Sequence, residues 1–283
     1  MTDQPASTPP RTIQVGLIGK GIQLSRTPAM HVEAGQALGL DYRYDLIDPD
    51  QMDSEPQFTD MLDRAEAAGF AGLNITFPYK KAVIPHLHHL SDAAKNVGAV
   101  NTVVFRDGQR FGHNTDFWGF AEGMRQYLPG ADMATVLLLG AGGAGGAVAH
   151  ALKDLGTETL LIHDINPDGA AKLAAETGGM PVTNLEDAAD KATGIVNATP
   201  MGMAKLPGTA IPTSLLRPEQ WVTDIVYFPI ETELLRDARA KGCRTLNGGG
   251  MALYQAVRAF ELFTGIKPDA TIMRARFDAF DRG

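Results

Sequence analysis

The sequence predicts a two-domain α/β protein in which an N-terminal α/β domain is followed by a doubly wound parallel sheet. Strand-like and helix-like segments alternate along nearly the whole chain, which is typical of layered α/β folds with mostly parallel strands. The 283 residues exceed the commonest size of a single domain. A hydrophobic fraction of 44% with 20% charged residues is ordinary for a protein with a sizeable core.

The charge and the cysteine content limit the classes of partner and compartment. The net charge is −8 and no concentrated run of Lys and Arg occurs, so we expect neither a nucleic-acid surface nor an anionic-membrane patch. No apolar stretch approaches the roughly 18–20 residues of a membrane span. The single cysteine, Cys243, excludes an intrachain disulfide and fits the cytoplasm. The sequence leaves the oligomeric state open between a monomer and a homodimer.

The N-terminal half carries the signals of a mixed α/β domain. Residues 1–12 are polar and proline-rich, and we expect a disordered tail there. Thr27 is placed as the N-cap of a helix, with Pro28 at its first position. The expected elements are a strand at 12–19, a helix ending near Leu38, a strand at 42–47, a helix at 57–68, a strand at 71–77, a short helix at Pro85 and a hairpin at 99–116 that turns at Asp107-Gly108.

The C-terminal half has the pattern of a parallel sheet. Its first strand, 134–140, is a continuous apolar run, as expected of a strand covered on both faces. The two helices at about 250–264 and 268–280 follow the last strand, so the pattern alone allows them to close this domain or to pack on the first one. The remaining expected elements are helices at 116–128, 148–155, 168–176 and 232–241, and strands at 159–164, 194–199, 221–227 and 243–247.

A glycine-rich turn connects the strand at 134–140 to the following helix. Its G-x-G-x-x-G spacing falls on Gly140, Gly142 and Gly145. The first glycine permits a tight turn, the second lets the backbone approach a pyrophosphate, and the third lets helix and strand pack closely. This strand–turn–helix context predicts a Rossmann domain, whose nucleotide-binding residues are Gly140, Ala141, Gly142, Gly143, Ala144 and Gly145.

An acidic residue at the end of the next strand predicts the cofactor. Asp164 lies about 19 residues beyond Gly145, close to the spacing of a ribose-binding acid. Its carboxylate would accept hydrogen bonds from both ribose hydroxyls and would repel a 2′-phosphate. The segment 164–168 supplies no Arg or Lys for that phosphate. The sequence therefore favours NAD over NADP.

Polar side chains gather at strand ends of the N-terminal half. Some have an ordinary structural explanation, such as helix capping for Thr27, a surface turn for Lys80 or turn formation for Asn114 and Asp116. Several uncharged donors with one lysine and one carboxylate would also suit a small polyhydroxy acid. The residues concerned are Ser25, Thr27, Thr76, Lys80, Asn101, Asn114 and Asp116.

Seven motifs in consistent order give the chain a resemblance to the shikimate dehydrogenase family, from about Ile13 to Phe280. The family's substrate motif S-x-S-P-x-x-H occurs with threonine at the second serine position. The matching stretches are Ser25–His31, Asn74–Lys80, Gly98–Thr102, Asn114–Asp116, Asn197–Met203, Asp224–Leu235 and Gly248–Ala256.

The resemblance implies a role for each matching residue. Lys80 and Asp116 would be the catalytic pair, which moves the hydroxyl proton when hydride passes to the nicotinamide. We treat them as a coupled pair without assigning protonation states. The implied substrate-binding residues are Ser25 and Thr27 for the carboxylate, Thr76, Asn101, Asp116 and Gln255 for the ring hydroxyls, and Tyr227 near the carboxylate. The implied nicotinamide-binding residues are Asn197, Thr199, Met203 and Gly250.

The resemblance also implies the domain boundaries and the branch of the family. The final helices would return to the first domain, which gives a substrate domain of residues 13–116 plus 251–283 and an NAD-binding domain of residues 117–250. Thr27 and Asp164 together resemble the branch that uses NAD and accepts quinate as well as shikimate.

Three alternatives remain open from the sequence. The first is an NADP-dependent dehydrogenase that acts on shikimate only. A methylene-tetrahydrofolate dehydrogenase also pairs a lysine with a Rossmann domain, but would leave the hydroxyls of Ser25 and Thr27 without a purpose. A non-catalytic regulator that binds a dinucleotide or a shikimate-like ligand would not need Lys80 and Asp116.

Three other features are interpreted as structural. The histidines at 86, 88 and 89 lack carboxylate or cysteine partners at ligand spacing, so a solvated helix face is expected there and no metal site. Cys243 is interpreted as strand packing. Arg26 is expected to point away from the hydroxyls on either side of it.

Overall fold

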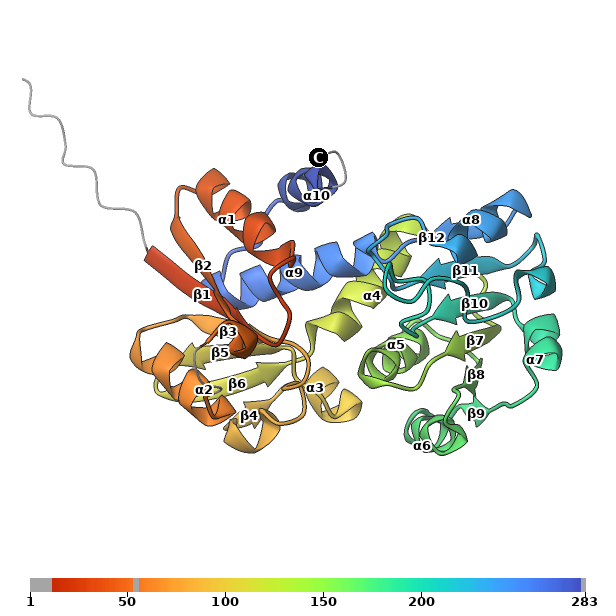
Figure 1. Cartoon of the computed structure of the whole chain (residues 1–283), viewed down its shortest axis with the longest axis horizontal. Coiled ribbons are helices and arrows are strands. Elements are labelled where there is room, and N and C mark those ends of the chain that lie inside the picture. Colours follow the sequence, from red (N-terminus) through yellow and green to blue (C-terminus); the bar gives the residue numbers. More distant parts are fainter. Residues whose placement is uncertain (1–11, 53–55, 281–283) are drawn as a thin grey trace, which may run out of the picture. The chain divides into compact units, whose positions relative to one another are not determined.

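The computed structural model describes residues 12–52 and 56–280. The tail predicted at 1–12 therefore lies outside the described residues, apart from Thr12, which opens the first strand. The chain forms two compact units, shown in Figure 1. Among the described residues, the first contains 12–52, 56–91, 100–113 and 259–280, and the second contains 92–99 and 114–258.

The first unit is built on a six-stranded mixed sheet with the order β2-β1-β3-β5-β6-β4. Strands β2, β1 and β3 are parallel to one another. Strand β5 is antiparallel to β3, and β6 is antiparallel to β5. The turn of the hairpin at Asp107 and Gly108 has positive φ at both residues, as the sequence predicted. The strands are β1 (Thr12–Ile18), β2 (Asp41–Ile47), β3 (Gly72–Ile75), β4 (His89–Leu90), β5 (Thr102–Arg106) and β6 (Gln109–His113).

Helices cover this sheet, and one of them comes from the far end of the sequence. Helix α1 (Thr27–Ala37) packs on β2, and α10 (Ala270–Ala279) packs on α1. The aromatic ring of Phe260 stacks on Tyr42 of β2, with ring centroids 4.9 Å apart. The C-terminal helices therefore return to the first unit. Its other helices are α2 (Phe58–Ala67) and the 3-10 turns η1 (Pro49–Gln51) and η2 (Ile84–His86).

The second unit contains a six-stranded sheet with the order β12-β11-β10-β7-β8-β9, in which every neighbouring pair is parallel. This is the doubly wound order, with β7 central and the direction of winding reversing between β7 and β10. Ligands of such sheets bind beyond the carboxyl ends of the strands at this reversal. The strands are β7 (Thr135–Leu139), β8 (Thr159–His163), β9 (Met180–Pro181), β10 (Gly194–Asn197), β11 (Trp221–Asp224) and β12 (Arg244–Leu246).

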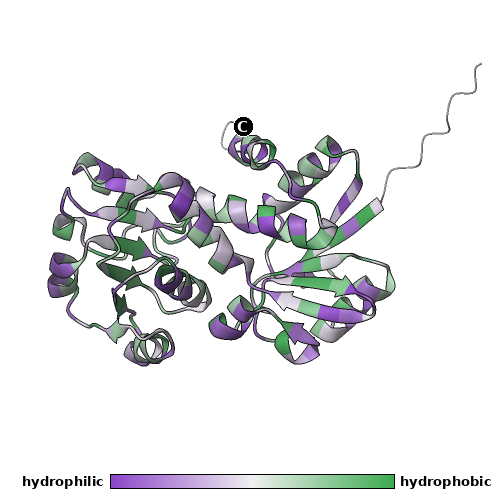
Figure 2. Ribbon diagram, turned by 180° about the vertical axis from the view of Figure 1, so that it is seen from behind, coloured by the Kyte–Doolittle hydropathy of each residue, from purple (hydrophilic) through white to green (hydrophobic). Residues whose placement is uncertain are grey.

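Helices on both faces of this sheet explain its apolar strands. Val136 and Leu138 pack into one core with α4, α5 and α6, whereas Leu137 and Leu139 pack into a second core with α7 and α8. Successive residues thus face opposite layers, and all must be apolar. Figure 2 shows the central strands in the hydrophobic colour. The helices are α4 (Thr115–Tyr127), α5 (Gly143–Asp154), α6 (Pro167–Thr177), α7 (Leu185–Lys191), α8 (Glu233–Ala240) and α9 (Gly249–Thr264), with α3 (Asp92–Val97) and the 3-10 turn η3 (Thr213–Leu215).

The predicted fold class is confirmed by these two sheets and the returning C-terminal helices. The units differ from the predicted boundaries at 92–99, 114–116 and 251–258, which group with the second sheet. Helices α3 and α7 are short and were not predicted; Asn184 caps α7 through its side chain, a local signal that the sequence contains. Within the described ranges, no helix is long and apolar enough to cross a membrane.

The expected helix face at the three histidines is wrong. Only His86 lies in a helical turn, η2, whereas His89 belongs to the short strand β4. The ring of His89 stacks on Phe111, and His88 accepts a hydrogen bond from the backbone of Arg110 through Nδ1. His88 and His89 therefore contact β6 at the edge of the sheet.

Candidate active site

The glycine turn after β7 is as tight as the sequence predicts. Gly140 has φ of 100°, a conformation that side chains disfavour. Its N–H donates to the carbonyl of His163 at the end of β8 (2.8 Å). A Cβ on Gly140 would lie 2.9 Å from the backbone of Ala198. The turn is therefore held between the ends of β8 and β10, at the reversal of the sheet.

The backbone at Gly142 and Gly143 borders open space, and no side chain caps the start of the helix that follows. A Cβ on Gly142 or on Gly143 would have no atom within 4 Å, whereas one on Gly145 would overlap the carbonyl oxygen of Gly140. Helix α5 starts at Gly143 with no side-chain cap on its first turn. Backbone N–H groups at this end of the helix are suited to an anionic group such as a pyrophosphate. Ala141 and Ala144 complete the segment.

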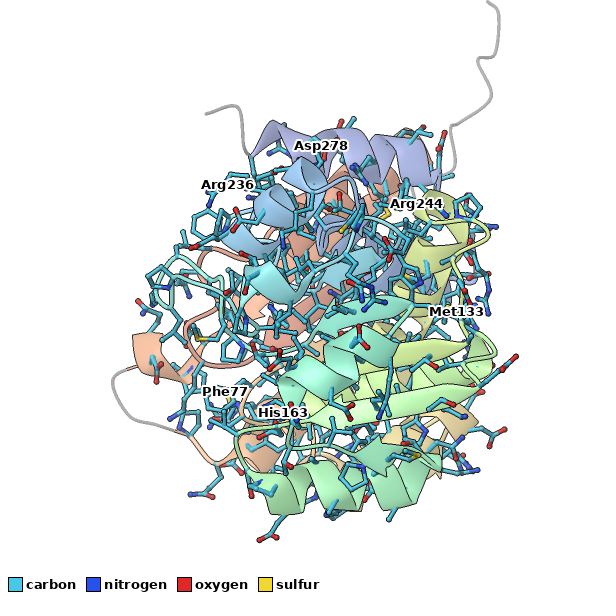
Figure 3. The ribbon with its side chains drawn as sticks, turned by 90° about the vertical axis from the view of Figure 1, so that its right-hand side faces the viewer. Phe77, Met133, His163, Arg236, Arg244 and Asp278 are labelled. Carbon is cyan, nitrogen blue, oxygen red and sulfur yellow. The ribbon has the colours of Figure 1, made fainter. Side chains whose placement is uncertain are left out.

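Asp164 is fixed directly beside the glycine turn. Its carboxylate accepts hydrogen bonds from the N–H of Ala141 (2.6 Å) and from the N–H of Asn166 (2.8 Å). A carboxylate has about four acceptor positions, so capacity remains for ribose hydroxyls. The preceding residue, His163, is labelled in Figure 3. Its Nδ1 contacts the carbonyl of Val182 (3.0 Å).

The loop after β10 is shaped by the side chain of Asn197. Its Oδ1 accepts from the N–H (3.0 Å) and the hydroxyl (2.7 Å) of Thr199, and its Nδ2 donates to the carbonyl of Met201 (3.0 Å). Met203 lies further along the loop and is 41% exposed. The N–H of Ala198 donates to the carbonyl of Leu139, which places this loop next to the glycine turn.

Asp224 is a part of this region that the sequence interpretation missed. It ends β11, is fully buried, and accepts hydrogen bonds from Asn197 Nδ2 (2.9 Å) and Thr232 Oγ1 (2.7 Å). Burial raises the pKa of this carboxyl to about 6. The signal was present in the sequence, because a single carboxylate within the apolar run 221–226 needs a buried partner.

The remaining predicted residues of the second unit lie on α4, on α9 and in the segment after β11. Asp116 is buried in the first turn of α4, whose N-cap Asn114 accepts from the N–H of Phe117 (3.0 Å). Gln255 is half-buried on α9, and Gly250 lies in the first turn of that helix. Tyr227 follows β11 and is 42% exposed.

The predicted residues of the first unit meet at one edge of its sheet. Ser25 and Thr27 follow β1, and Thr76 follows β3, whose carboxyl end lies beside that of β1. Asn101 precedes β5, which is antiparallel to β3, so its start lies at the same edge. The N–H of Val100 donates to the carbonyl of Lys80 (2.8 Å), which ties the lysine turn to this edge as well.

The local contacts at this edge order the backbone around the side chains. The N–H of Thr27 lies 3.4 Å from Ser25 Oγ, so the two hydroxyl residues form one turn at the start of α1. The N–H of Thr76 donates to the carbonyl of Ile18 (2.9 Å). Between Thr76 and Lys80, Phe77 is 72% exposed and visible at the surface in Figure 3.

The expected N-cap at this edge needs correction. The N-cap of α1 is Arg26, and Thr27 is its first helical residue. Arg26 is buried: it donates to the carbonyl of Phe277 (3.3 Å), and its guanidinium carbon lies 4.7 Å from the centre of the Phe277 ring. The arginine thereby joins the start of α1 to α10 at the turn that carries Ser25.

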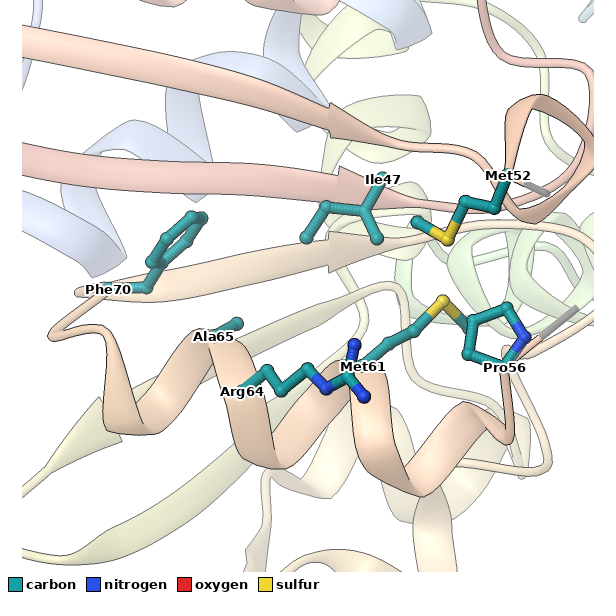
Figure 4. Close-up of a pocket in the computed structure, with 7 residues that line it drawn as sticks. All are labelled: Ile47, Met52, Pro56, Met61, Arg64, Ala65 and Phe70. Atoms are coloured by element: carbon teal, nitrogen blue, oxygen red, sulfur yellow. The ribbon is translucent and has the colours of Figure 1, made fainter. Parts of the chain in front are cut away.

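A separate small pocket lies in the first unit beside α2. Its volume is about 190 Å³ and its lining is mostly apolar (Figure 4). None of the predicted site residues lines it. The lining residues are Ile47, Met52, Pro56, Met61, Arg64, Ala65 and Phe70. In the part of the chain that the structure describes, no group of three or more His, Cys, Asp or Glu side chains could hold a metal ion.

Comparison with known proteins gives matches over most of the chain. The model of the shikimate dehydrogenase substrate binding domain matches residues 17–103, and that of the shikimate 5′-dehydrogenase C-terminal domain matches residues 248–276. The quinate/shikimate dehydrogenase (NAD+) of Corynebacterium efficiens is 50% identical over 278 residues, which cover 94% of this chain and 98% of that protein.

Two further matches bear on the cofactor. The shikimate dehydrogenase (NADP+) of Streptomyces avermitilis is 50% identical over 271 residues, 92% of this chain and 93% of that protein. Among solved structures, the quinate dehydrogenase from Corynebacterium glutamicum in complex with NAD has a TM-score of 0.92 and 47% identity, over 95% of this chain and 99% of that one.

Proposed function

Because the chain belongs to the shikimate dehydrogenase family, we propose that it is an NAD-dependent oxidoreductase acting on the ring secondary alcohol of quinate and shikimate. The reaction interconverts quinate with 3-dehydroquinate and shikimate with 3-dehydroshikimate. NAD, when bound, accepts the hydride from the alcohol carbon. The residues of the chain bind the two reactants, orient them and carry the hydroxyl proton.

The observation that carries the choice of NAD is the position of Asp164. Its carboxylate lies at the end of β8, held by the N–H of Ala141 in the glycine turn. A 2′-phosphate at the neighbouring ribose would meet this negative charge, whereas two hydroxyls would donate to it. Residues 165–168 contain no Arg or Lys that would offset the repulsion.

The open backbone after Gly140 is suited to the pyrophosphate of the cofactor. The absence of any atom within 4 Å of a Cβ at Gly142 or Gly143 leaves room for phosphate oxygens beside the N–H groups of α5. Asn197 and Thr199 order the loop after β10, and they bind the nicotinamide portion together with Met203 and Gly250. Residues 117–250 thus serve as the nucleotide-binding domain.

The proton is handled by Lys80 and Asp116. As the hydride leaves the alcohol carbon, the C–O bond becomes a carbonyl and the hydroxyl proton must pass to a base. Lys80 takes this proton or stabilises the developing alkoxide, and Asp116 acts with it as a coupled pair. In the reverse direction the same pair returns the proton.

The substrate is held by the polar edge of the first sheet and by residues beyond it. Residues 13–116 and 251–283 serve as the substrate domain. The hydroxyls of Ser25 and Thr27 bind the carboxylate of the substrate, with Tyr227 nearby. Thr76, Asn101, Asp116 and Gln255 contact its ring hydroxyls.

The compartment and the assembly belong to the same proposal. The enzyme works in the cytoplasm, where a single cysteine stays reduced. It acts as a monomer or a homodimer, with small hydroxy acids as partners and without nucleic acid or membrane.

Steady-state assays by NADH absorbance test this function. Quinate and shikimate are each measured with NAD and with NADP, and we expect turnover of both acids with a higher kcat/KM for NAD. Activity on shikimate with NADP alone would replace the proposal by the shikimate-only alternative. Binding of dinucleotide without turnover of either acid would identify a regulator.

A further inference from the structure

A carboxylate at the end of β2 contacts the loop that follows β1. These two strands are parallel neighbours whose last residues pair, so the residue that follows β2 lies beside the loop that follows β1. Asp48 Oδ1 accepts from the N–H of Gly21 (3.4 Å), and Asp48 Oδ2 accepts from the N–H of Ile22 (3.2 Å). The same Oδ2 also accepts from Gln23 Nε2 (3.1 Å).

Helix capping alone does not account for these bonds. Asp48 is the N-cap of the 3-10 turn η1, and this role uses one bond, from the N–H of Asp50 (3.1 Å). The other three bonds join Asp48 to residues that lie 25–27 positions earlier in the chain. A carboxylate has about four acceptor positions, so these bonds use its capacity. Burial of Asp48 favours the neutral carboxyl, but the hydrogen bonds outweigh burial and lower its pKa, so the group is ionised at neutral pH.

The bond to Ile22 connects the carboxylate to Ser25. The N–H of Ser25 donates to the carbonyl of Ile22 (2.9 Å), and the N–H of Ile22 donates to Asp48. Both ends of the loop have other anchors, because the N–H of Lys20 donates to the carbonyl of Phe77 (3.0 Å) and α1 begins two residues after Ser25. The bonds to Asp48 are made by the middle of the loop, between these anchors.

Loss of the carboxylate would change the path of the loop. The N–H groups of Gly21 and Ile22 would lose the acceptor that they have now. Ile22 is 7% exposed, so its N–H would stay buried and unsatisfied unless the loop turned toward water. Ser25 would move with the loop because its N–H is bonded to the carbonyl of Ile22. A displaced hydroxyl bonds less well to its ligand, since hydrogen bonds weaken steeply away from their preferred geometry.

We propose that Asp48 is a positioning residue, which holds the loop after β1 so that Ser25 directs its hydroxyl to the carboxylate of the bound hydroxy acid. The inference rests on the proposed role of Ser25 in substrate binding, and it does not require that Asp48 touch the substrate. The four donors to Asp48 also offset its negative charge, which would otherwise repel a carboxylate bound by the same loop.

The test compares Asp48 with a second aspartate of the same segment. Asp48→Ala removes all four bonds, and we expect KM for quinate and shikimate to rise by about three- to tenfold with kcat within about twofold, because the hydroxyl of Ser25 is displaced. Asp45→Ala is the matched control, since Asp45 lies on β2 and accepts from Gln14 Nε2 on β1 (2.8 Å). It should leave KM for both acids unchanged. KM for NAD should be unchanged in both variants.

Three further measurements separate positioning from a loss of overall stability. In Asp48→Ala, amide hydrogen exchange should speed up at Gly21 and Ile22 while the amides in the middle of β1 stay slow. Gln23→Ala removes only the side-chain bond and should change KM for the acids by less than about twofold. Asp48→Asn keeps the size of the side chain, but its amino group would face a backbone N–H in either orientation, so KM for the acids should rise here too.

Asp48→Asn keeps the inference open to test if Asp48→Ala does not fold. A lower thermal midpoint with unchanged KM for both acids in the Asp48 variants would show that Asp48 only stabilises the fold, and would overturn the positioning role.

Ser25→Ala distinguishes the two ways in which the inference can fail. If Ser25→Ala leaves KM for both acids unchanged, the role of Ser25 in the proposed site is wrong, and the inference falls with it. If Ser25→Ala raises KM but Asp48→Ala behaves like Asp45→Ala, the substrate contact stands and the positioning role of Asp48 is overturned. The double variant Asp48→Ala/Ser25→Ala should be no worse than the more affected single variant, because both changes act on one hydroxyl. Additive effects on KM would contradict a route through Ser25.

Discussion

Lys80 and Lys81 are adjacent in the sequence, but only Lys80 belongs to the proposed proton pair. Lys80 is half-buried and its backbone carbonyl is tied to Val100, whereas Lys81 is exposed. We expect Lys80→Ala to lower kcat by about 10²–10⁴-fold, the usual worth of general acid–base catalysis, with little change in substrate affinity. The matched variant Lys81→Ala should keep normal turnover. Near-normal kcat in Lys80→Ala would return this lysine to an ordinary surface turn.

The carboxylate of Asp164 determines the choice between the two dinucleotides. Asp164→Ser removes the negative charge, so we expect KM for NAD to rise and the preference for NAD over NADP to narrow. The exposed Asp168, in the first turn of α6, provides the control, and Asp168→Ser should keep the preference. Unchanged cofactor kinetics in Asp164→Ser would disprove this role.

The buried carboxyl of Asp224 predicts a pH dependence of stability. Its pKa is raised to about 6 in the folded state, above the ordinary 3.8, so the folded protein binds this proton more tightly than the unfolded chain does. The group therefore contributes most stability below pH 3.8, and that contribution is lost as the pH rises through about 6. The size of the effect is up to about 3 kcal/mol.

Asp224→Asn removes this titration at nearly constant shape. Urea midpoints measured at pH 4.5 and 7.5 should fall less between the two values in the variant than in the natural protein. Parallel pH profiles for the two proteins would show that Asp224 titrates normally.

The sequence predicts the roles of residues that depend on their neighbours along the chain. It does not predict the roles of residues whose partners lie far away in the sequence. The glycine turn and Asp164 are recognisable because their spacing along the chain sets their geometry. Arg26 packs against Phe277, and Asp48 bonds to Ile22, across intervals that no local pattern spans. Their burial emerges only when the sheet and the C-terminal helix are placed.

At the scale of secondary-structure elements, Gly142 and Gly145 in the turn between β7 and α5 have different roles. A methyl group on Gly142 meets no atom, and its φ of −74° suits alanine, so Gly142→Ala should fold with stability unchanged or slightly raised. The same methyl group occupies the space proposed for the pyrophosphate, and KM for NAD should rise.

Gly145→Ala should behave differently. Its methyl group would overlap the carbonyl oxygen of Gly140, so the helix must move away from the turn. We expect both the thermal midpoint and NAD affinity to fall, measured by calorimetry and by titration. If Gly142→Ala lost stability while Gly145→Ala did not, the assignment of the two glycines would be reversed.

Elements with a long pattern were predicted within a few residues, and the short ones were missed. The apolar strand β7 and helix α9 show continuous or periodic apolar residues that specify their type. Helices α3 and α7 have six and seven residues, too few for a periodic pattern to emerge. The three histidines at 86, 88 and 89 were misassigned because a polar run near a proline fits a helix face and a sheet edge equally well.

At the scale of the whole molecule, neither compact unit is one continuous segment of chain. The chain leaves the first unit after residue 91, returns at 100, leaves again after 113 and returns at 259. The C-terminal segment contributes Phe260, which is fully buried and stacked on Tyr42. The first unit therefore depends on residues from the far end of the sequence.

Phe260→Ala tests this dependence. Removing a fully buried phenylalanine should lower the free energy of unfolding by about 3–5 kcal/mol. Amide hydrogen exchange should speed up mainly in β1 and β2, with less change in β7 and β8, because the cavity lies in the first unit. Ile266→Ala, at a position 38% exposed, should have a small effect. Equal loss of protection in all four strands would show that the units unfold together.

The discontinuous first unit has a consequence for biosynthesis. A ribosome makes residues 12–91 early, yet the segment from 259 that completes their packing emerges only after the whole of the second unit. The nascent sheet of the first unit must wait, with the face that receives Phe260 uncovered, while the later-made unit can already fold. We therefore expect the second unit to fold before the first during synthesis, and the nascent N-terminal sheet to be the part of the polypeptide with most need of a chaperone.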